Sequence, residues 1–307
     1  SGRLHLGNLA CSLLAWLSAK SQGGRIVLRI EDLDAERCPR IYADLLEQDL
    51  AWLGLVWDEG GSTGGPHGPY YQSECADIYT GQYKKLEAQG LVYPCFCSRA
   101  QLHAASAPHT SDGNVIYPGT CRDLTAAQIA EKRKKKAPAY RLMVPDEDIT
   151  FTDGCMGKHT ENLLQDCGDF YLRRADGVFA YQLAVVVDDH FQGVSEIVRG
   201  ADLIEPTVRQ ISLYQLFGWK VPDYIHLPLA LNPQGAKLSK QNHAPALPKV
   251  DPRPVLIAAL HFLGQQVETH WQDFSVEQIL QSAVKNWTLT AVPESAIVNS
   301  TFSNASC

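Results

Sequence analysis

Apolar residues recur at helical spacing in three segments near the start of the chain, at residues 4–20, 40–53 and 78–89. Each segment is long enough for an amphipathic helix, so the spacing predicts three helices. Short apolar and β-branched runs at 26–30 and 54–58 lie between them and predict strands. Helices that alternate with strands are typical of an α/β fold built on a parallel sheet.

The pattern changes after residue 92. Cysteines and prolines interrupt residues 93–172, and a nearly continuous apolar run at 179–187 then predicts a strand buried on both faces. The last residues, 250–307, carry mainly helical periodicity. We therefore expect residues 1–92 and 173–249 to form the two halves of a catalytic domain. Residues 93–172 would be an insertion between them, and the rest a short helical C-terminal region.

Composition narrows the class of protein. The chain has 307 residues, of which 45% are hydrophobic and 20% charged, as in ordinary globular proteins. No apolar run approaches the ~18 residues of a membrane span. A net charge of −7 excludes a uniformly basic nucleic-acid coat, although not a local basic patch. Nine cysteines, an odd number, indicate reduced thiols and a metal site. We expect a monomeric cytoplasmic enzyme that does not bind membranes.

Two short segments could hold phosphate groups. His5, Gly7 and Asn8 stand directly before the first predicted helix, whose N-terminus offers free N–H groups to an anion. Lys237 and Lys240, on a predicted loop, could neutralise a triphosphate during displacement at phosphorus. Each segment alone also fits an ordinary surface turn or a solvated charge pair. The two together are much more specific.

These two segments resemble the HIGH and KMSKS signatures of class I aminoacyl-tRNA synthetases. The matching sequences are HLGN at 5–8 and KLSKQ at 237–241. Four longer stretches narrow the resemblance to the glutamyl branch of that family: RIEDLD at 29–34, YQSE at 71–74, GLVYPC at 90–95 and GADL at 200–203. The resemblance covers essentially the whole chain and implies a Rossmann-like parallel sheet.

Between the lysine loop and the last residue of this sequence there is no room for an anticodon-binding domain. In this respect the chain resembles the short paralogues of the glutamyl branch. That resemblance implies activation of glutamate by ATP with Mg²⁺, then transfer of glutamate to the queuosine base of tRNA(Asp). One alternative is a catalytic fragment of a glutamyl-tRNA synthetase that charges tRNA(Glu). Another is an inactive synthetase-like protein that only binds tRNA or a partner. A generic nucleotidyltransferase would not explain the stretches at 29–34 and 200–203.

The resemblance also implies roles for particular residues. His5 and Lys240 would stabilise charge on the phosphates, with assistance from Lys237. ATP would contact a set of residues in the two signatures: His5, Gly7, Asn8 and Lys240. Glutamate would lie against Glu31, Tyr181 and Arg199. Without the resemblance, Glu31 and Arg199 would equally well form a simple ion pair at a strand end.

Three thiols, those of Cys95, Cys97 and Cys121, fall in the predicted insertion and suit a structural Zn²⁺. Spacing leaves His103 or His109 open as the fourth ligand. The resemblance implies Tyr117 instead. Structural thiols without a metal are the alternative.

The chain departs from the family pattern at several positions. Ser1 falls inside the first signature, so the family's preceding strand, which supplies part of the glutamate pocket, is missing from this sequence. Cys75 stands where the family usually has arginine, and Gln241 replaces a serine.

Two further clusters are ambiguous. The basic run at 132–136 could contact RNA or form a solvated helix face, and 188–190 (DDH) is expected at a strand end, as part of the active-site wall.

Overall fold

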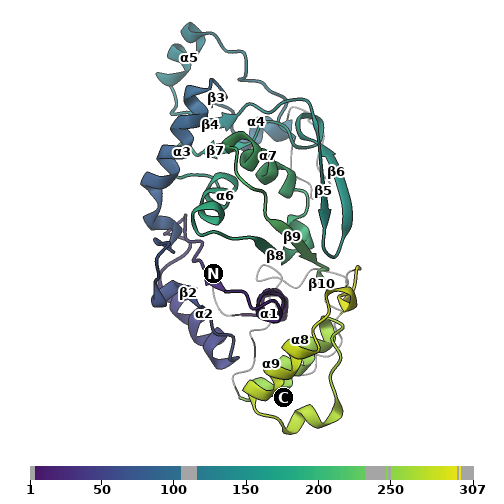
Figure 1. Ribbon diagram of the computed structural model, residues 1–307. Coiled ribbons are helices and arrows are strands. Elements are labelled where there is room, and N and C mark those ends of the chain that lie inside the picture. Colours follow the sequence, from purple (N-terminus) through teal and green to yellow (C-terminus); the bar gives the residue numbers. More distant parts are fainter. Residues whose placement is uncertain (1–3, 105–115, 232–246, 248–249, 296, 299–307) are drawn as a thin grey trace.

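The computed structural model describes residues 4–104, 116–231, 247, 250–295 and 297–298 (Figure 1). Its α-helices are α1 (Leu6–Ser21), α2 (Ile41–Trp52), α3 (Ala76–Ala88), α4 (Arg99–Ala104), α5 (Ala126–Arg133), α6 (Tyr181–Phe191), α7 (Thr207–Phe217), α8 (Pro252–Phe262) and α9 (Val276–Lys285). Its strands are β1 (Val27–Leu28), β2 (Glu59–Gly60), β3 (Val92–Cys95), β4 (Ala139–Leu142), β5 (Asp148–Asp153), β6 (Gly157–Asn162), β7 (Tyr171–Arg173), β8 (Glu196–Gly200), β9 (Asp223–Leu227), β10 (Ala230–Leu231) and β11 (Ile297–Val298). In the described parts of the chain, no helix has the length and apolar character needed to cross a membrane.

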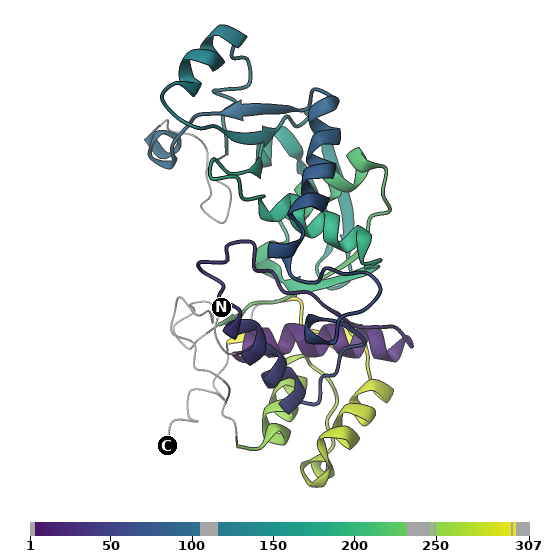
Figure 2. The ribbon, with the colours of Figure 1, turned by 90° about the vertical axis from the view of Figure 1, so that its left-hand side faces the viewer.

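Helix α1 is the first helix that the apolar spacing predicts, and it lies at the centre of one core. Leu9, Leu13, Leu14 and Leu17 recur on its inner face and are fully buried. This face packs against β8, α8 and α9. Figure 2 shows α1 lying crosswise between the strands above it and the C-terminal helices below. The other two predicted helices are confirmed as α2 and α3.

Strands β8 and β9 form a parallel pair that separates two cores. Tyr224 of β9 packs with α3, α6 and α7, whereas Ile225 and Leu227 pack with α1, α8 and α9. Successive side chains of a strand point to opposite faces, so one short strand supplies both cores. Figure 1 shows α6 and α7 on one side of this pair and α1 on the other.

The single parallel sheet that the sequence predicts is not found among the described residues. They contain separate parallel pairs, β1 with β2, β8 with β9, and β10 with β11. No described strand connects β1 to β8, so the hydrogen-bond ladder breaks between these pairs. The α/β character is confirmed, but the prediction of one continuous sheet is wrong for this part of the chain.

The strand predicted at 54–58 begins later, at Glu59. Just before this strand, the Ile26 N–H donates a hydrogen bond to the Asp58 carboxylate at 2.8 Å instead of to a backbone carbonyl of the neighbouring strand. The parallel ladder with β1 therefore runs from Val27–Glu59 to Leu28–Gly60. Beyond it, Ile30 and Tyr71 form a further parallel bridge.

The strand predicted at 179–187 is wrong, because most of this run lies in helix α6. A continuous apolar run fits a buried strand or a helix buried on all sides, and periodicity does not distinguish them. Helix α6 contacts α3, α7 and β7. Leu183 and every residue from there to Asp189 are buried. Asp188, Asp189 and His190 therefore lie on the last turns of a helix, not at a strand end.

Residues 93–172 carry an antiparallel sheet in the order β3–β4–β7 and the hairpin of β5 and β6. Part of this segment, including Leu142, Leu163 and Leu172, is buried in the core with α3, α6 and α7. Its own apolar cluster is small and contains Tyr93, Cys95, Phe96, Tyr117 and Cys121. The helical prediction for the C-terminal region is confirmed by α8 and α9.

Candidate active site

His5 caps the N-terminus of α1, as the first signature predicts. Its Nδ1 accepts hydrogen bonds from the N–H groups of Gly7 (3.1 Å) and Asn8 (3.4 Å). The side-chain oxygen of Asn8 accepts a hydrogen bond from the His5 N–H, which completes a capping box. Because Nδ1 is an acceptor, the ring proton is on Nε2. A neutral imidazole with its proton on Nε2 therefore caps the positive end of the helix dipole.

The segment that follows the lysine loop is joined to the first signature. The Leu247 N–H donates to the Leu4 carbonyl at 3.0 Å, and the Leu4 N–H donates to the Asp49 carboxylate of α2 at 3.1 Å. Leu247 is 4% exposed and belongs to the core around α1. Lys237 and Lys240 themselves lie outside the described residues. Their proposed role rests on the sequence.

Arg29 lies at the centre of an ion-pair network. One guanidinium nitrogen donates to Asp189 at 2.7 Å and to Gln192 at 3.1 Å, and the other donates to Glu31 at 3.3 Å. Burial lowers the pKa of Arg29, but the charges of Asp189, Glu31 and Asp188 outweigh this effect and raise the pKa. Arg29 thus connects Glu31, a predicted glutamate ligand, to helix α6.

The second carboxylate of α6 is equally buried. Asp188 accepts hydrogen bonds from Gln72 at 2.8 Å and from Tyr79 at 2.9 Å. Burial raises the pKa of Asp188 to about 6, although the charge of Arg29 opposes the shift. Asp188 and Asp189 thus lie behind Arg29, whereas His190 stacks on Trp219, and a role of residues 188–190 in the active-site wall stays a prediction. The contact with Arg29 is long-range, so the sequence offered no signal for this partner.

Arg199 is 8% exposed and held at two points. Its Nε donates to Nε2 of His226 at 3.0 Å, and one terminal nitrogen donates to the Thr207 hydroxyl at 2.7 Å. His226 Nδ1 in turn lies 2.6 Å from Asp153, whose carboxylate also accepts the His226 backbone N–H. The simple strand-end ion pair with Glu31 is not what holds Arg199 in place.

Burial lowers the pKa of His226, and the neighbouring Arg199 lowers it further, while Asp153 opposes both. Asp153 itself stays ionised, because its hydrogen bonds to His226 and to backbone N–H groups outweigh the effect of burial and lower its pKa. His226 is therefore neutral near pH 7, with its proton on Nδ1 towards Asp153. Its lone pair on Nε2 is then the acceptor for Arg199. Neither His226 nor Asp153 is predicted from the sequence.

The charges of Glu31 and Arg199 both act on Tyr181, the third predicted glutamate ligand. Tyr181 is the first residue of α6, and burial raises its pKa, as does the charge of Glu31, while Arg199 and Arg29 lower it. Glu31 keeps 42% of its side chain exposed, so its carboxylate is accessible. An accessible carboxylate and a guanidinium around one phenol suit the ammonium and carboxylate of an amino acid.

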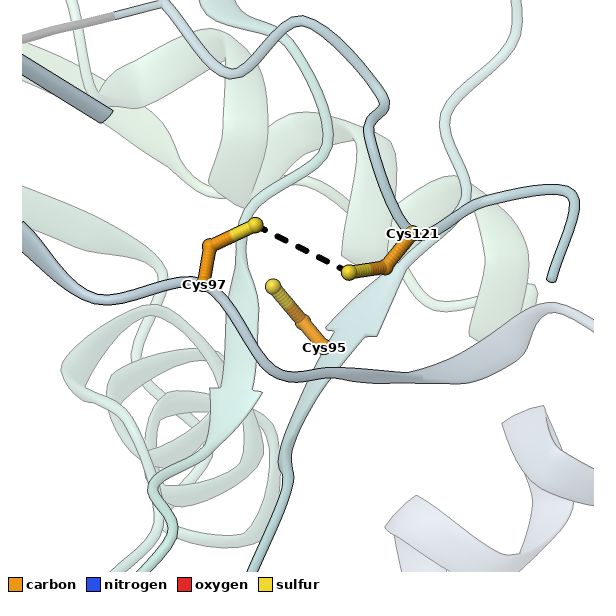
Figure 3. A group of neighbouring side chains, drawn as sticks. All are labelled: Cys95, Cys97 and Cys121. Atoms are coloured by element: carbon orange, nitrogen blue, oxygen red, sulfur yellow. Dashed lines mark hydrogen bonds between the residues drawn. The ribbon is translucent and has the colours of Figure 1, made fainter. Parts of the chain in front are cut away.

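The predicted metal ligands also converge. The thiols of Cys95, Cys97 and Cys121 lie within 4.8 Å of one another (Figure 3). The sulfur atoms of Cys97 and Cys121 are 3.7 Å apart, and the Cys95 sulfur is 3.6 Å from the Tyr117 hydroxyl. Around a tetrahedral ion with Zn–S bonds of ~2.3 Å, sulfur atoms would be roughly 3.8 Å apart. The donor set and its spacing therefore fit zinc.

The surroundings favour charge on the Cys95 sulfur, whereas burial and the neighbouring Cys95 and Cys121 raise the pKa of Cys97 to about 11. Burial raises the pKa of Cys95, but the hydrogen bond and charge of Arg141 outweigh it and lower the pKa. The Phe96 N–H donates to the Cys121 sulfur at 3.5 Å. Tyr117 is 5% exposed, and its hydroxyl accepts the Cys121 N–H at 2.7 Å. His109 and the side chain of His103 lie outside the described residues, so the structure does not test either as the fourth ligand.

The sequence matches the family described as "tRNA synthetases class I (E and Q), catalytic domain" over residues 1–296. It is 59% identical to the glutamyl-Q tRNA(Asp) synthetase of Escherichia coli O6:H1 (strain CFT073), covering 100% of this chain and 92% of that one. The protein of the same name from Citrobacter koseri is 51% identical, with 100% and 95% covered.

Solved structures agree with these relatives. A glutamate tRNA ligase from Elizabethkingia meningosepticum, in complex with its amino acid, superposes with a TM-score of 0.79 at 27% identity. The glutamate-tRNA synthetase of Elizabethkingia anophelis gives the same values. Each covers 98% of this chain, which spans only 65% and 66% of their lengths. The predicted resemblance is thus confirmed, and the chain belongs to the class I tRNA synthetases of the glutamyl and glutaminyl group.

Proposed function

We propose that this chain activates glutamate with ATP and transfers it to the queuosine base of tRNA(Asp). Relatives that bear the corresponding name are 47–59% identical over essentially the whole chain. The observation that carries the proposal is the pair of opposite charges around Tyr181. Glu31 offers a carboxylate to the substrate ammonium, and Arg199 offers a guanidinium to a substrate carboxylate.

The first step is displacement at phosphorus. A glutamate carboxylate oxygen attacks the α-phosphorus of ATP, the bond to pyrophosphate breaks, and glutamyl-adenylate forms. His5 donates its Nε2 proton as a hydrogen bond to a phosphate oxygen at the N-terminus of α1, with Gly7 and Asn8 beside it. Lys237 and Lys240 neutralise the growing charge. Mg²⁺ accompanies the ATP phosphates and neutralises part of their charge.

The second step is acyl transfer. A hydroxyl of the queuosine cyclopentenediol attacks the activated carbonyl carbon, AMP leaves, and the hydroxyl proton is released. Arg29 acts through Glu31, because it fixes the carboxylate that holds the substrate ammonium. Positioning of this kind lowers the barrier by converting an encounter into an intramolecular step.

The first test is glutamate-dependent exchange of pyrophosphate into ATP without tRNA. Exchange with glutamate, but not with glutamine or aspartate, would support the proposal. A requirement for tRNA(Glu) would favour a fragment of a glutamyl-tRNA synthetase. No exchange under either condition would favour a tRNA-binding protein without catalysis. The Lys240→Ala variant should lower exchange without a loss of stability, and an unchanged rate would remove Lys240 from the mechanism.

We further propose that Cys95, Cys97, Tyr117 and Cys121 hold a structural Zn²⁺. All four donors belong to the protein, so no coordination position is left for substrate, and the ion would stabilise the fold rather than catalyse. The apolar cluster around these ligands is small. A bound metal would stabilise this small cluster, because the free energy of metal binding contributes to folding.

Cys97→Ser should release zinc and loosen the insertion. Metal content by elemental analysis would fall towards zero, and limited proteolysis would cut within residues 93–172. Cys155→Ser is the matched control, because Cys155 is also half-buried but lies outside the cluster. Full zinc content in the Cys97 variant would contradict the assignment.

A further inference from the structure

A cavity of about 390 Å³ lies between the acidic segment 31–34 and the start of α2. It lies beyond the carboxyl end of β1, where Ile30 and Tyr71 form their parallel bridge and line the cavity. Ligands of open α/β folds bind at this end of parallel strands. The volume is sufficient for one nucleoside.

One side of the cavity is a flat, stacked surface. The Arg40 guanidinium lies over the Tyr71 ring, 3.3 Å from its centroid, and Tyr42 lines the cavity beside it. Glu74 holds the guanidinium from the outside at 3.1 Å. Planar guanidinium groups and tyrosine rings are the side chains on which proteins stack unpaired bases.

Another side is acidic. Asp32 and Glu31 both line the cavity. Asp32 is 7% exposed and is fixed by the N–H and hydroxyl of Ser73 at 2.9 and 2.7 Å. A carboxylate has about four lone-pair sites, so Asp32 retains acceptor capacity for a ligand. The combination of a stacking surface and carboxylates suits a flat base that carries a cation.

The cavity is separate from the proposed phosphate site. The N-terminus of α1 contacts α2 at Asp49, nine residues beyond Arg40. At ~1.5 Å per residue, these two points on α2 are roughly 14 Å apart. The cavity does share Glu31 with the proposed glutamate site. It therefore lies beside the activated amino acid but away from the triphosphate.

We propose that this cavity binds the modified nucleoside that accepts glutamate, an inference that rests on the proposed function. The deazaguanine ring stacks on Arg40 above Tyr71. The protonated secondary amine of the queuosine side chain faces Asp32. The cyclopentenediol then reaches the glutamyl carbonyl held beside Glu31. This assigns Arg40 a role in acceptor recognition and none in the activation of glutamate.

The test compares the two half-reactions in Arg40→Ala and Arg40→Lys. The kcat/KM for transfer of radiolabelled glutamate to tRNA(Asp) that carries queuosine should fall about tenfold in both variants, because lysine keeps the charge but not the planar stack. Pyrophosphate exchange without tRNA should stay within about twofold of wild type. Arg25→Ala is the control, because Arg25 is similarly exposed and ion-paired (with Glu59, 3.4 Å) but does not line the cavity.

Unchanged transfer in the Arg40 variants would overturn the proposal. An equal loss of exchange, with a higher KM for ATP or glutamate, would also overturn it and assign the cavity to activation. If wild type exchanges pyrophosphate but does not transfer glutamate to this tRNA, the proposed function fails, and binding of free queuosine nucleoside decides the inference separately. Binding that is lost in Arg40→Ala would support the nucleoside site, and no binding by wild type would overturn it.

Discussion

At the scale of single residues, His5 has two functions that act through different ring nitrogens. Nδ1 accepts hydrogen bonds from the backbone N–H groups of Gly7 and Asn8 and so caps the first turn of α1. Nε2 carries the proton that the proposed mechanism directs at a phosphate. A substitution can therefore remove one function and keep the other. Asparagine is among the best residues at a helix N-cap but has no group that reaches as far as Nε2.

We expect His5→Asn to retain the stability of wild type but to lower pyrophosphate exchange about a hundredfold, because one donor to the transition state is lost. His5→Ala should show the same loss of rate and also unfold more easily, by about 1 kcal/mol, because the cap is lost. Thermal denaturation and exchange kinetics on both variants test this separation. Normal exchange in His5→Asn would show that only the cap matters.

His226 fixes Arg199 only in its neutral form. Protonation of Nε2 would remove the acceptor for the Arg199 Nε–H and place two cations in contact. Because the pKa of His226 is lowered from 6.5 in the folded protein, the folded state binds fewer protons there than the unfolded chain does. Its contribution to stability is therefore present above pH 6.5 and is lost as the pH falls through the lower folded pKa.

The KM for glutamate in the exchange reaction should accordingly rise as the pH falls below 6.5. Asp188, with a pKa raised to about 6, titrates in the same window, so a comparison must isolate the histidine. His226→Gln retains an acceptor for Arg199 and a donor for Asp153 without titrating. It should flatten part of the pH dependence. An identical profile in both proteins would exclude His226 as the titrating group.

At the scale of elements, the pairing of β1 with β2 depends on one glycine. Gly60 has φ +97°, and a Cβ there would collide with the Leu28 carbonyl of the neighbouring strand. The close approach of the two backbones therefore requires a residue without a side chain. This strand pair leads directly into the Ile30–Tyr71 bridge and so into the proposed nucleoside cavity.

Gly60→Ala should destabilise the protein by about 2–4 kcal/mol, because both the backbone conformation and the contact become strained. Gly81→Ala is the control within α3, where an added Cβ meets no atom within 4 Å. That change should stabilise by about 0.5–1 kcal/mol, because alanine loses less conformational freedom in a helix. Chemical denaturation measures both effects. Equal stabilities of the two variants would contradict this account of the β1–β2 pair.

Most helices could be predicted from the sequence, because α1 and α3 bury one face and expose the other. Helix α6 could not, because its apolar residues are buried on every side and leave no period to detect. The short strands were located less well: β1 lies within the predicted run 26–30, but β2 begins only after the predicted run 54–58 has ended. A side chain, that of Asp58, replaces a backbone partner at the start of β2, and such long-range substitutions leave no mark on local pattern.

At the scale of the whole molecule, the three thiols that the sequence singles out do lie together, whereas the roles of Glu31, Tyr181 and Arg199 in glutamate binding stay a prediction. Their supporting residues were not predicted. Asp189 and His226 are distant in sequence from Arg29 and Arg199, the groups they hold. Motif spacing reports the residues that touch substrate, whereas the residues behind them become visible only through three-dimensional contacts.

The parallel pair β8–β9 has a consequence for building chimeras with related synthetases. Ile225 and Tyr224 are consecutive residues, yet they belong to different cores. A chimera that takes only the elements on one side of this pair from a donor synthetase would pack donor side chains against host side chains in one of the two cores. The cysteine cluster is self-contained, but the insertion that carries it is not, because Leu142, Leu163 and Leu172 are buried in the core with α3, α6 and α7. A chimera must therefore take β8 and β9 together with the packing partners on both of their faces, the buried part of the insertion included.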